Sequence, residues 1–211
     1  MYLSRVEIDI NNRKKVKDLT HIGAFHNWVE NCFPDEIRSG IRTRKLWRID
    51  DLNGKEYLLI VSQARPSIKH LELYGVEGTA QTKNYDDFLE KIENGRKYRF
   101  RVVLNPVVAE MDKEGGNRGR TKPLPNSKHM QFLYDRSEKN GFRLNKDEFY
   151  VVCRGHTSLK KESMKEVRLS KVVYEGRLTV VDKELLKESL SKGIGKKKAY
   201  GFGMMTLIPE D

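Results

Sequence analysis

Five histidines occur in this sequence of 211 residues, and the imidazole group suits proton transfer near neutral pH. His26 is the leading candidate for that role. Apolar periodicity places it on the apolar face of a helix over residues 22–33, which Pro34 ends. The same position permits a second interpretation, in which His26 is a hydrogen-bonded histidine of the core. Spacing alone favours the core interpretation.

His21 precedes His26 by five residues, which on a regular helix separates the two side chains by about 140°. The pair is therefore poorly arranged to bind one metal ion. The other histidines, His70, His129 and His156, are isolated, and we expect them to be structural or solvent-facing. The sequence contains no HExxH motif, no acidic run typical of a two-metal nuclease and no GxSxG motif. We therefore expect an enzyme of this sequence to need no metal ion and no other cofactor.

The run GIGKKKAYGFG near the end of the sequence combines glycines, lysines and an aromatic ring. Glycines let a backbone approach a bulky ligand, lysines and backbone N–H groups bind phosphates, and a tyrosine stacks on bases. The candidate nucleic-acid-binding residues of this run are Gly193, Gly195, Lys196, Lys197, Lys198, Tyr200, Gly201 and Gly203. The run matches neither the Walker loop nor the GxGxxG fingerprint. A tight turn between a helix and an edge strand explains it equally well.

A second basic cluster lies in and beside the connection between two predicted strands. Its members are Arg154, Lys160, Lys161, Lys165, Arg168 and Lys171. A basic hairpin can lie along a duplex backbone, although a solvated loop explains the same residues. Residues 1–95 carry equal numbers of basic and acidic side chains, so the excess of +11 belongs to residues 96–211. Such a one-sided excess is typical of a polyanion-binding protein, with a merely solubilising surface as the alternative.

Hydrophobic periodicity predicts two passes of the order strand–helix–strand–strand–helix–strand. The first pass begins with strand 2–10, helix 22–33, and strands 43–49 and 56–62 joined by an Asn53-Gly54 turn. Residues 66–95 then contain a short helix, a strand near 70–75 and a helical turn at 86–93. The second consists of strand 98–104, a Gly- and Arg-rich loop at 114–120, helix 127–139, strands 148–154 and 168–181, helix 183–190, and strand 204–208. We therefore predict an α+β fold, a tandem pair of ferredoxin-like (βαββαβ) domains covering residues 1–95 and 96–211.

Two further features indicate the compartment. No apolar run is long enough to span a bilayer, and the charged start of the sequence is unlike a signal peptide, so no membrane partner is expected. The two cysteines, Cys32 and Cys153, are far apart and form no CxxC motif. We expect a reduced, cytoplasmic protein.

Four segments, in order along the whole sequence, resemble the CasE family, the CRISPR RNA endoribonucleases of type I-E Cascade. These segments are Met1–Val6 (MYLSRV), Phe100–Pro106 (FRVVLNP), Tyr174–Asp182 (YEGRLTVVD) and Gly193–Leu207 (GIGKKKAYGFGMMTL). The resemblance implies two ferredoxin-like domains that bind the hairpin of a CRISPR repeat and stay bound as a Cascade subunit. It also implies metal-independent cleavage at the base of the stem, in which the 2′-OH attacks the adjacent phosphate and leaves a 2′,3′-cyclic phosphate and a 5′-OH.

The same resemblance assigns the catalytic role to His26, because the family's histidine lies in the first helix and Phe33-Pro34 fits its spacing. This reverses the preference for a core histidine. Relatives often carry a tyrosine three residues before the histidine, where this sequence has Gly23. His21 or a tyrosine from elsewhere is then the candidate assistant. A non-catalytic RNA-binding subunit of the same fold is the alternative function.

Overall fold

The computed structural model describes residues 1–109, 121–161 and 164–210, with side chains in the long hairpin described up to residue 160 and again from residue 166. The predicted loop at 114–120 therefore lies outside the described residues. The helices are α1 (Arg13–Val16), α2 (Ile22–Asn31), α3 (Pro34–Ser39), α4 (Ile68–Leu71), α5 (Asp86–Leu89), α6 (His129–Ser137) and α7 (Lys183–Lys192), with 3₁₀ turns η1 (Asn126–Lys128), η2 (Glu138–Asn140) and η3 (Lys198–Tyr200). No helix in this described part combines the length and the apolar character needed to cross a bilayer.

The N-terminal sheet consists of four antiparallel strands. They are β1 (Tyr2–Glu7), β2 (Lys45–Leu52), β3 (Lys55–Ser62) and β4 (Gln81–Asn84), in the spatial order β2-β3-β1-β4. Asn53 and Gly54 both have positive φ, 55° and 76°, which is the geometry of the tight turn predicted between β2 and β3. Strand order and connections are those of a ferredoxin-like unit.

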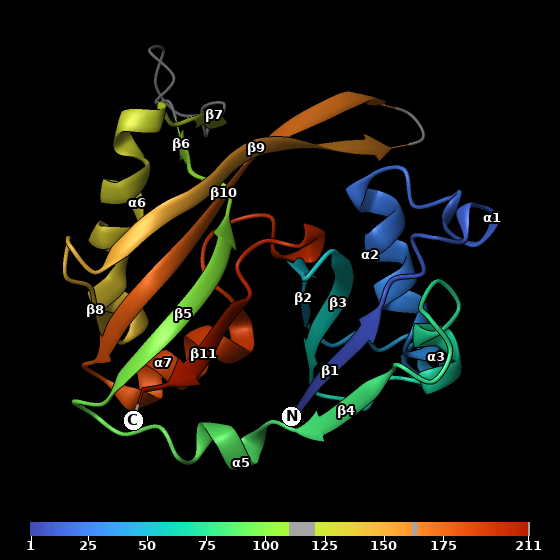
Figure 1. The fold of residues 1–211 in the computed structure, drawn as a ribbon, viewed down its shortest axis with the longest axis horizontal. Coiled ribbons are helices and arrows are strands. Elements are labelled where there is room, and N and C mark those ends of the chain that lie inside the picture. Colours follow the sequence, from blue (N-terminus) through green and yellow to red (C-terminus); the bar gives the residue numbers. More distant parts are fainter. Residues whose placement is uncertain (110–120, 162–163, 211) are drawn as a thin grey trace.

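The C-terminal sheet repeats this order (Figure 1). It contains β5 (Lys97–Leu104), β8 (Phe142–Arg143), β9 (Phe149–Lys161), β10 (Met164–Val180) and β11 (Met205–Pro209), while β6 (Val107–Ala109) and β7 (Thr121–Pro123) form a separate small ribbon. β11 pairs with β5, β5 with β10, and β10 with β9, all antiparallel. The predicted tandem of ferredoxin-like folds is therefore confirmed, whereas the domain boundary near residue 95 stays a prediction.

The β9–β10 hairpin is much longer than the strands 148–154 and 168–181 that the sequence predicts. β10 pairs with β5 from Val172 toward its C-terminal end. Before Val172, β10 pairs, among the described residues, only with β9, as far as the Lys161–Met164 pair. Figure 1 shows this two-stranded ribbon leaving the C-terminal sheet and arching over α2. The connection predicted as a basic hairpin is thus a long arm that reaches the N-terminal half.

Three apolar clusters hold the fold together. One is the core of the C-terminal sheet, where α6 and α7 cover one face, and it also takes in Leu46 and Val61 from β2 and β3. The second lies between the N-terminal sheet and α2, around Trp28 and Val29. The third is a small cluster in which Ile22, at the start of α2, packs with residues of the arm and of the segment after α7. The two halves therefore share packed surface.

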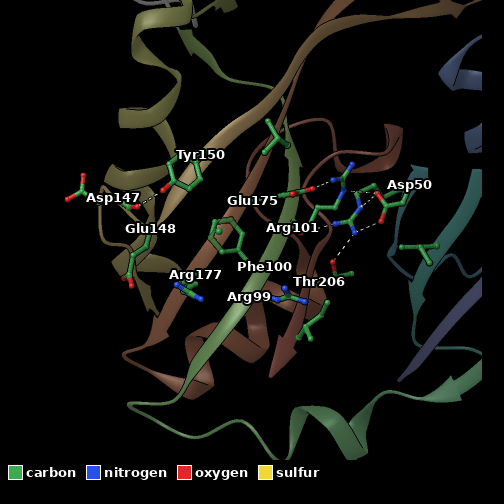
Figure 2. A pocket seen from close by; sticks show the side chains of 15 residues that line it. Asp50, Arg99, Phe100, Arg101, Asp147, Glu148, Tyr150, Glu175, Arg177 and Thr206 are labelled. Atoms are coloured by element: carbon green, nitrogen blue, oxygen red, sulfur yellow. Dashed lines mark hydrogen bonds and ion pairs between the residues drawn. The ribbon is translucent and has the colours of Figure 1, made fainter. Parts of the chain in front are cut away.

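A buried arginine adds a polar connection between the halves. Arg48 of β2 is 2% exposed, and its five N–H groups all have acceptors. The acceptors are both carboxylate oxygens of Asp50 at 2.8 and 2.6 Å, the carbonyls of Arg101 at 2.8 Å and Met204 at 3.0 Å, and Thr206 Oγ1 at 2.8 Å. Asp50 also accepts from Arg101, which in turn pairs with Glu175 (Figure 2).

Two local predictions are wrong. The strand expected near 70–75 is absent: residues 68–71 form α4, Gly75 makes only an isolated bridge with Ile8, and the fourth strand of the sheet is β4. Pro34 does not simply end the first helix. That helix ends at Asn31, and Pro34 begins α3 at its first position, where proline is favoured because its missing N–H is not needed.

Candidate active site

The start of α2 is organised by His21. Its backbone is extended (φ −156°), it is the N-cap of the helix, and its Nδ1 accepts a hydrogen bond from the N–H of Gly23 at 3.0 Å. An added Cβ on Gly23 would lie 2.8 Å from His21 Cε1 and 3.3 Å from the carbonyl oxygen of Lys160. Glycine at position 23 therefore lets the imidazole cap the helix while the arm passes close by.

His26 lies one turn further along α2 and is half-buried rather than part of the core. Its pKa is lowered from its usual value chiefly by burial, and further by the charges of Arg42 and Lys45, while Glu30 on the same helix acts in the opposite sense. The lowered pKa favours the neutral imidazole near pH 7. A neutral, partly exposed imidazole can accept a proton from a bound molecule.

The arm contributes Leu159 and Lys160 near its tip. Leu159 is 3% exposed and packs in the small apolar cluster with Leu169 of β10, Phe202 and Ile22. This packing holds the arm on the start of α2. Neighbouring side chains alternate across a strand, so the next residue, Lys160, is exposed and lies at the rim of the cavity that His26 lines.

The segment from Gly193 to Gly203, called here the glycine–lysine loop, connects α7 to β11. Its base is closed by Gly193 and Gly203, which are buried and have positive φ, and by a 2.9 Å hydrogen bond from Ile194 N to the Gly203 carbonyl. An added Cβ on Gly203 would lie 2.4 Å from the carbonyl oxygen of Ile194. These two glycines therefore shape the loop, while Gly195, Lys196 and Lys197 are exposed at its tip.

Tyr200, at the end of η3, brings this loop to His26. The two ring centroids are 5.3 Å apart and the rings meet edge to face at 63°. Together with the arm they enclose an open cavity of about 480 Å³. Its lining residues are His21, Gly23, Ala24, His26, Asn27, Leu159, Lys160 and Tyr200. The first helix, the basic hairpin and the glycine–lysine loop, three features found separately in the sequence, thus meet at one cavity.

Both histidines of the first helix line this cavity. The angular separation expected for a regular helix does not apply to them, because His21 is the N-cap with extended backbone and precedes the helical turns. The remaining histidines are elsewhere: His129 is buried with Nε2 3.1 Å from the Leu124 carbonyl, His70 contacts Ser67, and His156 lies on the arm.

The other predicted cations with described side chains do not line the cavity. Arg154 and Arg168 are exposed on the arm, where Arg168 lies 3.3 Å from Nδ1 of His156. The side chains of Lys161 and Lys165 lie outside the described residues. Lys198 is half-buried, and its pKa is lowered chiefly by burial and by the nearby charge of Arg44.

Sequence reasoning missed the segment before β2. Arg42 and Arg44 are exposed there, and their charges act on His26 and Lys198 respectively. They belong to the half of the chain with no net charge, so the charge count could not single them out. The proximity of Arg42 to His26 and of Arg44 to Lys198 depends on tertiary structure and leaves no local signal in the sequence.

A larger cavity of about 720 Å³ lies elsewhere, between the helix-free faces of the two sheets. Its wall includes Arg99, Tyr150 and the Arg101–Glu175 pair (Figure 2). None of the described residues that line it is a histidine or a predicted site residue. We therefore place the candidate chemistry at the smaller His26 cavity.

Comparison with known proteins identifies the family. A family model described as CRISPR associated protein matches residues 1–209. The chain belongs to this family. It is 29% identical over 222 residues to the CRISPR-associated endoribonuclease Cse3 of Thermus thermophilus, covering 99% of this chain and 100% of that protein.

Solved structures of family members share the fold over the whole chain. A structure of Cse3 bound to a 19-nucleotide RNA superimposes with a TM-score of 0.80 at 23% identity, covering 99% of both chains. A chain of a CRISPR RNA-guided surveillance complex, in a pre-nicking state, gives 0.68 at 19% identity and covers 100% of both. These similarities establish the tandem fold of the CRISPR-associated family for this chain.

Proposed function

We propose that this protein is a metal-independent endoribonuclease that binds the hairpin repeat of CRISPR precursor RNA and cuts it at the base of the stem. The observation that carries the proposal is the cavity where His26 of α2, Lys160 of the arm and Tyr200 of the glycine–lysine loop come together. Membership of the CRISPR-associated family and the likeness to Cse3 support it.

The proposed reaction is an internal transesterification. The ribose 2′-OH attacks the adjacent phosphorus, the bond to the 5′-oxygen breaks, and the products carry a 2′,3′-cyclic phosphate and a 5′-OH. The neutral imidazole of His26 accepts the proton of the 2′-OH, and the departing 5′-oxygen takes a proton from water. Alignment of the 2′-OH with that leaving oxygen supplies much of the rate. Lys160, at the rim of the same cavity, stabilises the additional negative charge on the phosphorane oxygens.

We assign RNA binding to the cations that extend from this cavity. Arg154, Lys160 and Arg168 along the arm, with Lys161 and Lys165 nearer its tip, contact the phosphates of the stem. Lys196, Lys197 and Lys198 of the glycine–lysine loop bind the backbone on the other side of the cavity. A-form RNA has a deep, narrow major groove, so these contacts are mainly to phosphate and to helix shape.

The partners of the proposed function are the CRISPR repeat hairpin and the other subunits of a Cascade complex. The whole-chain likeness to a chain of an RNA-guided surveillance complex supports the second of these. In this proposal the protein keeps its cleaved RNA and remains with it as a subunit. It acts in the cytoplasm, where precursor RNA is transcribed.

Cleavage of a cognate repeat hairpin in EDTA tests the proposal, with wild type and His26→Ala compared side by side. We expect wild type to leave 2′,3′-cyclic phosphate ends, and His26→Ala to lose cleavage while it binds RNA with unchanged affinity. His156→Ala, on the arm, is the matched control and should cleave. Tight binding of the cognate repeat without cleavage by the wild type would contradict the proposal and favour a non-catalytic RNA-binding subunit. Gly23, which stands where relatives often carry a tyrosine, is the feature that favours this second function.

A further inference from the structure

Trp47 of β2 lies between α2, which carries His26, and the glycine–lysine loop, which carries Tyr200. It is 2% exposed. Its indole Nε1 donates a hydrogen bond to the carbonyl oxygen of Ala199 at 2.9 Å, and its ring stacks on Phe25, with 6.2 Å between centroids and 23° between planes. Phe25 immediately precedes His26, and Ala199 immediately precedes Tyr200. One buried side chain therefore touches the neighbours of both rings.

The glycine–lysine loop is shaped to fit this indole. Gly201 has φ +78°, and an added Cβ would lie between 2.9 and 3.2 Å from the six-membered ring of Trp47. The backbone of the loop therefore passes directly against the ring face, which only glycine permits in this conformation. The residue after Tyr200, like the residue before it, is in contact with Trp47.

Few other hydrogen bonds hold this part of the loop. Tyr200 N–H bonds to the Lys197 carbonyl at 2.9 Å, which lies within the loop itself. Gly203 N–H bonds to the Val103 carbonyl at 2.8 Å, but this fixes the base of the loop rather than η3. Among the described residues, the bond from Trp47 is the hydrogen bond that ties η3 to the half of the chain that carries His26.

We propose that Trp47 is a positioning residue that sets Tyr200 against His26, so that the cavity has one defined shape for the RNA. It acts from within the core, through Phe25 on one side and Ala199 on the other, and does not itself touch RNA. This inference deepens the proposed function and rests on it for its kinetic consequences. Its structural consequence, a change at His26 when Trp47 is altered, does not depend on catalysis.

The chain offers a matched control. Trp28 is also buried, at 1% exposed, and its indole Nε1 also donates to a backbone carbonyl, that of His70, at 3.0 Å. That acceptor lies within the N-terminal half and away from the cavity. Trp28 also packs near Phe25, with 6.3 Å between ring centroids. Trp47→Phe and Trp28→Phe therefore each remove one indole hydrogen bond beside Phe25, but only the first loosens η3.

Single-turnover cleavage at saturating RNA gives the kinetic test. We expect Trp47→Phe to slow cleavage by roughly ten- to a hundredfold, as expected for a displacement of about 1 Å at a reacting centre, with RNA affinity almost unchanged. Trp28→Phe should cleave at the wild-type rate. In a Tyr200→Ala background, Trp47→Phe should have a much smaller effect, because the route through Ala199 to Tyr200 is gone and only the contact with Phe25 remains. Equal losses in the two tryptophan variants, or independent effects of Trp47 and Tyr200, would overturn the proposal.

NMR of the histidine rings tests the same inference without RNA. In Trp47→Phe, we expect the cross-relaxation between the His26 and Tyr200 rings to weaken and the pKa of His26 to move back toward 6.5 as the ring becomes more exposed. Gly201→Ala leaves Trp47 in the core and should produce the same change if Trp47→Phe does not fold. Unaltered His26 resonances in these variants would refute the positioning role. If they do change but wild type cuts no repeat RNA, the positioning role stands and the proposed function fails.

Discussion

The guanidinium of Arg48 donates a hydrogen bond to the carbonyl oxygen of Met204 at 3.0 Å. This bond joins β2 of the N-terminal sheet to the residue that immediately precedes β11 of the C-terminal sheet. This bond is one of five from a side chain that is 2% exposed. The glycine–lysine loop ends one residue before Met204, so the same bond fixes the position of that loop relative to the half of the chain that carries His26.

Arg48→Met should lower the free energy of unfolding by roughly 3 kcal/mol, because the carbonyls of Arg101 and Met204 lose their donor in a buried place. Chemical denaturation measures this. Arg99→Met, on the exposed face of β5, is the control and should change stability by no more than about 0.5 kcal/mol. Equal effects of the two variants would mean that the Arg48 network does not join the halves.

The pKa of His26 should change in opposite directions when a basic or an acidic neighbour is removed. Its pKa lies below the usual 6.5 because burial and the positive charge of Arg42 disfavour the imidazolium, whereas Glu30 favours it. Arg42→Ala should therefore raise the pKa and move the acidic limb of the cleavage profile to higher pH. Glu30→Gln should move it to lower pH. Shifts in the same direction would rule out this electrostatic account.

The salt dependence of RNA affinity should identify the cations that bind phosphate. Each phosphate contact releases counterions, so Lys160→Ala should reduce the slope of log Kd against log salt by about 1. Lys83→Ala, on the outer strand β4, serves as the control and should leave the slope as it is. An unchanged slope for Lys160→Ala would remove this residue from the RNA-binding surface.

The cap of α2 makes a prediction about Gly23. Alanine normally stabilises a helix by about 1 kcal/mol relative to glycine. In this protein Gly23→Ala should not bring that gain, because the added Cβ displaces the His21 imidazole from its bond to the N–H of residue 23. In a His21→Ala background the conflict with the imidazole is gone and only the 3.3 Å approach to the Lys160 carbonyl oxygen remains, so the same substitution should be more favourable than in wild type. Thermal unfolding of wild type and the three variants measures this difference, and its absence would show that the cap is not strained by a side chain at position 23.

Much of the topology was predictable because the apolar periods of strands and helices are local properties. β5 and the helix of His26 are examples, and the Asn53-Gly54 turn has the expected geometry. The helix α3 was missed because a proline such as Pro34 is compatible both with the end of one helix and with the first turn of the next. The false strand near residue 70 arose from a short apolar run, in which Leu71 is buried by a single helical turn.

The candidate site was predictable only in pieces. His26 and the glycine–lysine loop stood out from residue types, but their contact could not be deduced. The bond from Trp47 to Ala199 joins positions 152 residues apart, and a tryptophan in an apolar strand looks like any core residue. The charge count likewise could not single out Arg42, because the basic and acidic side chains of residues 1–95 are equal in number.

The arrangement of the site across the chain also determines when it can exist during synthesis. His26 leaves the ribosome early, but the arm and the glycine–lysine loop that enclose it are translated much later. A nascent chain that has reached only β5 therefore has the histidine but lacks Leu159, Lys160 and Tyr200 of the cavity lining. If the proposed function holds, the newly made protein cannot act on RNA before the glycine–lysine loop has been made and packed, so translation itself delays the onset of activity.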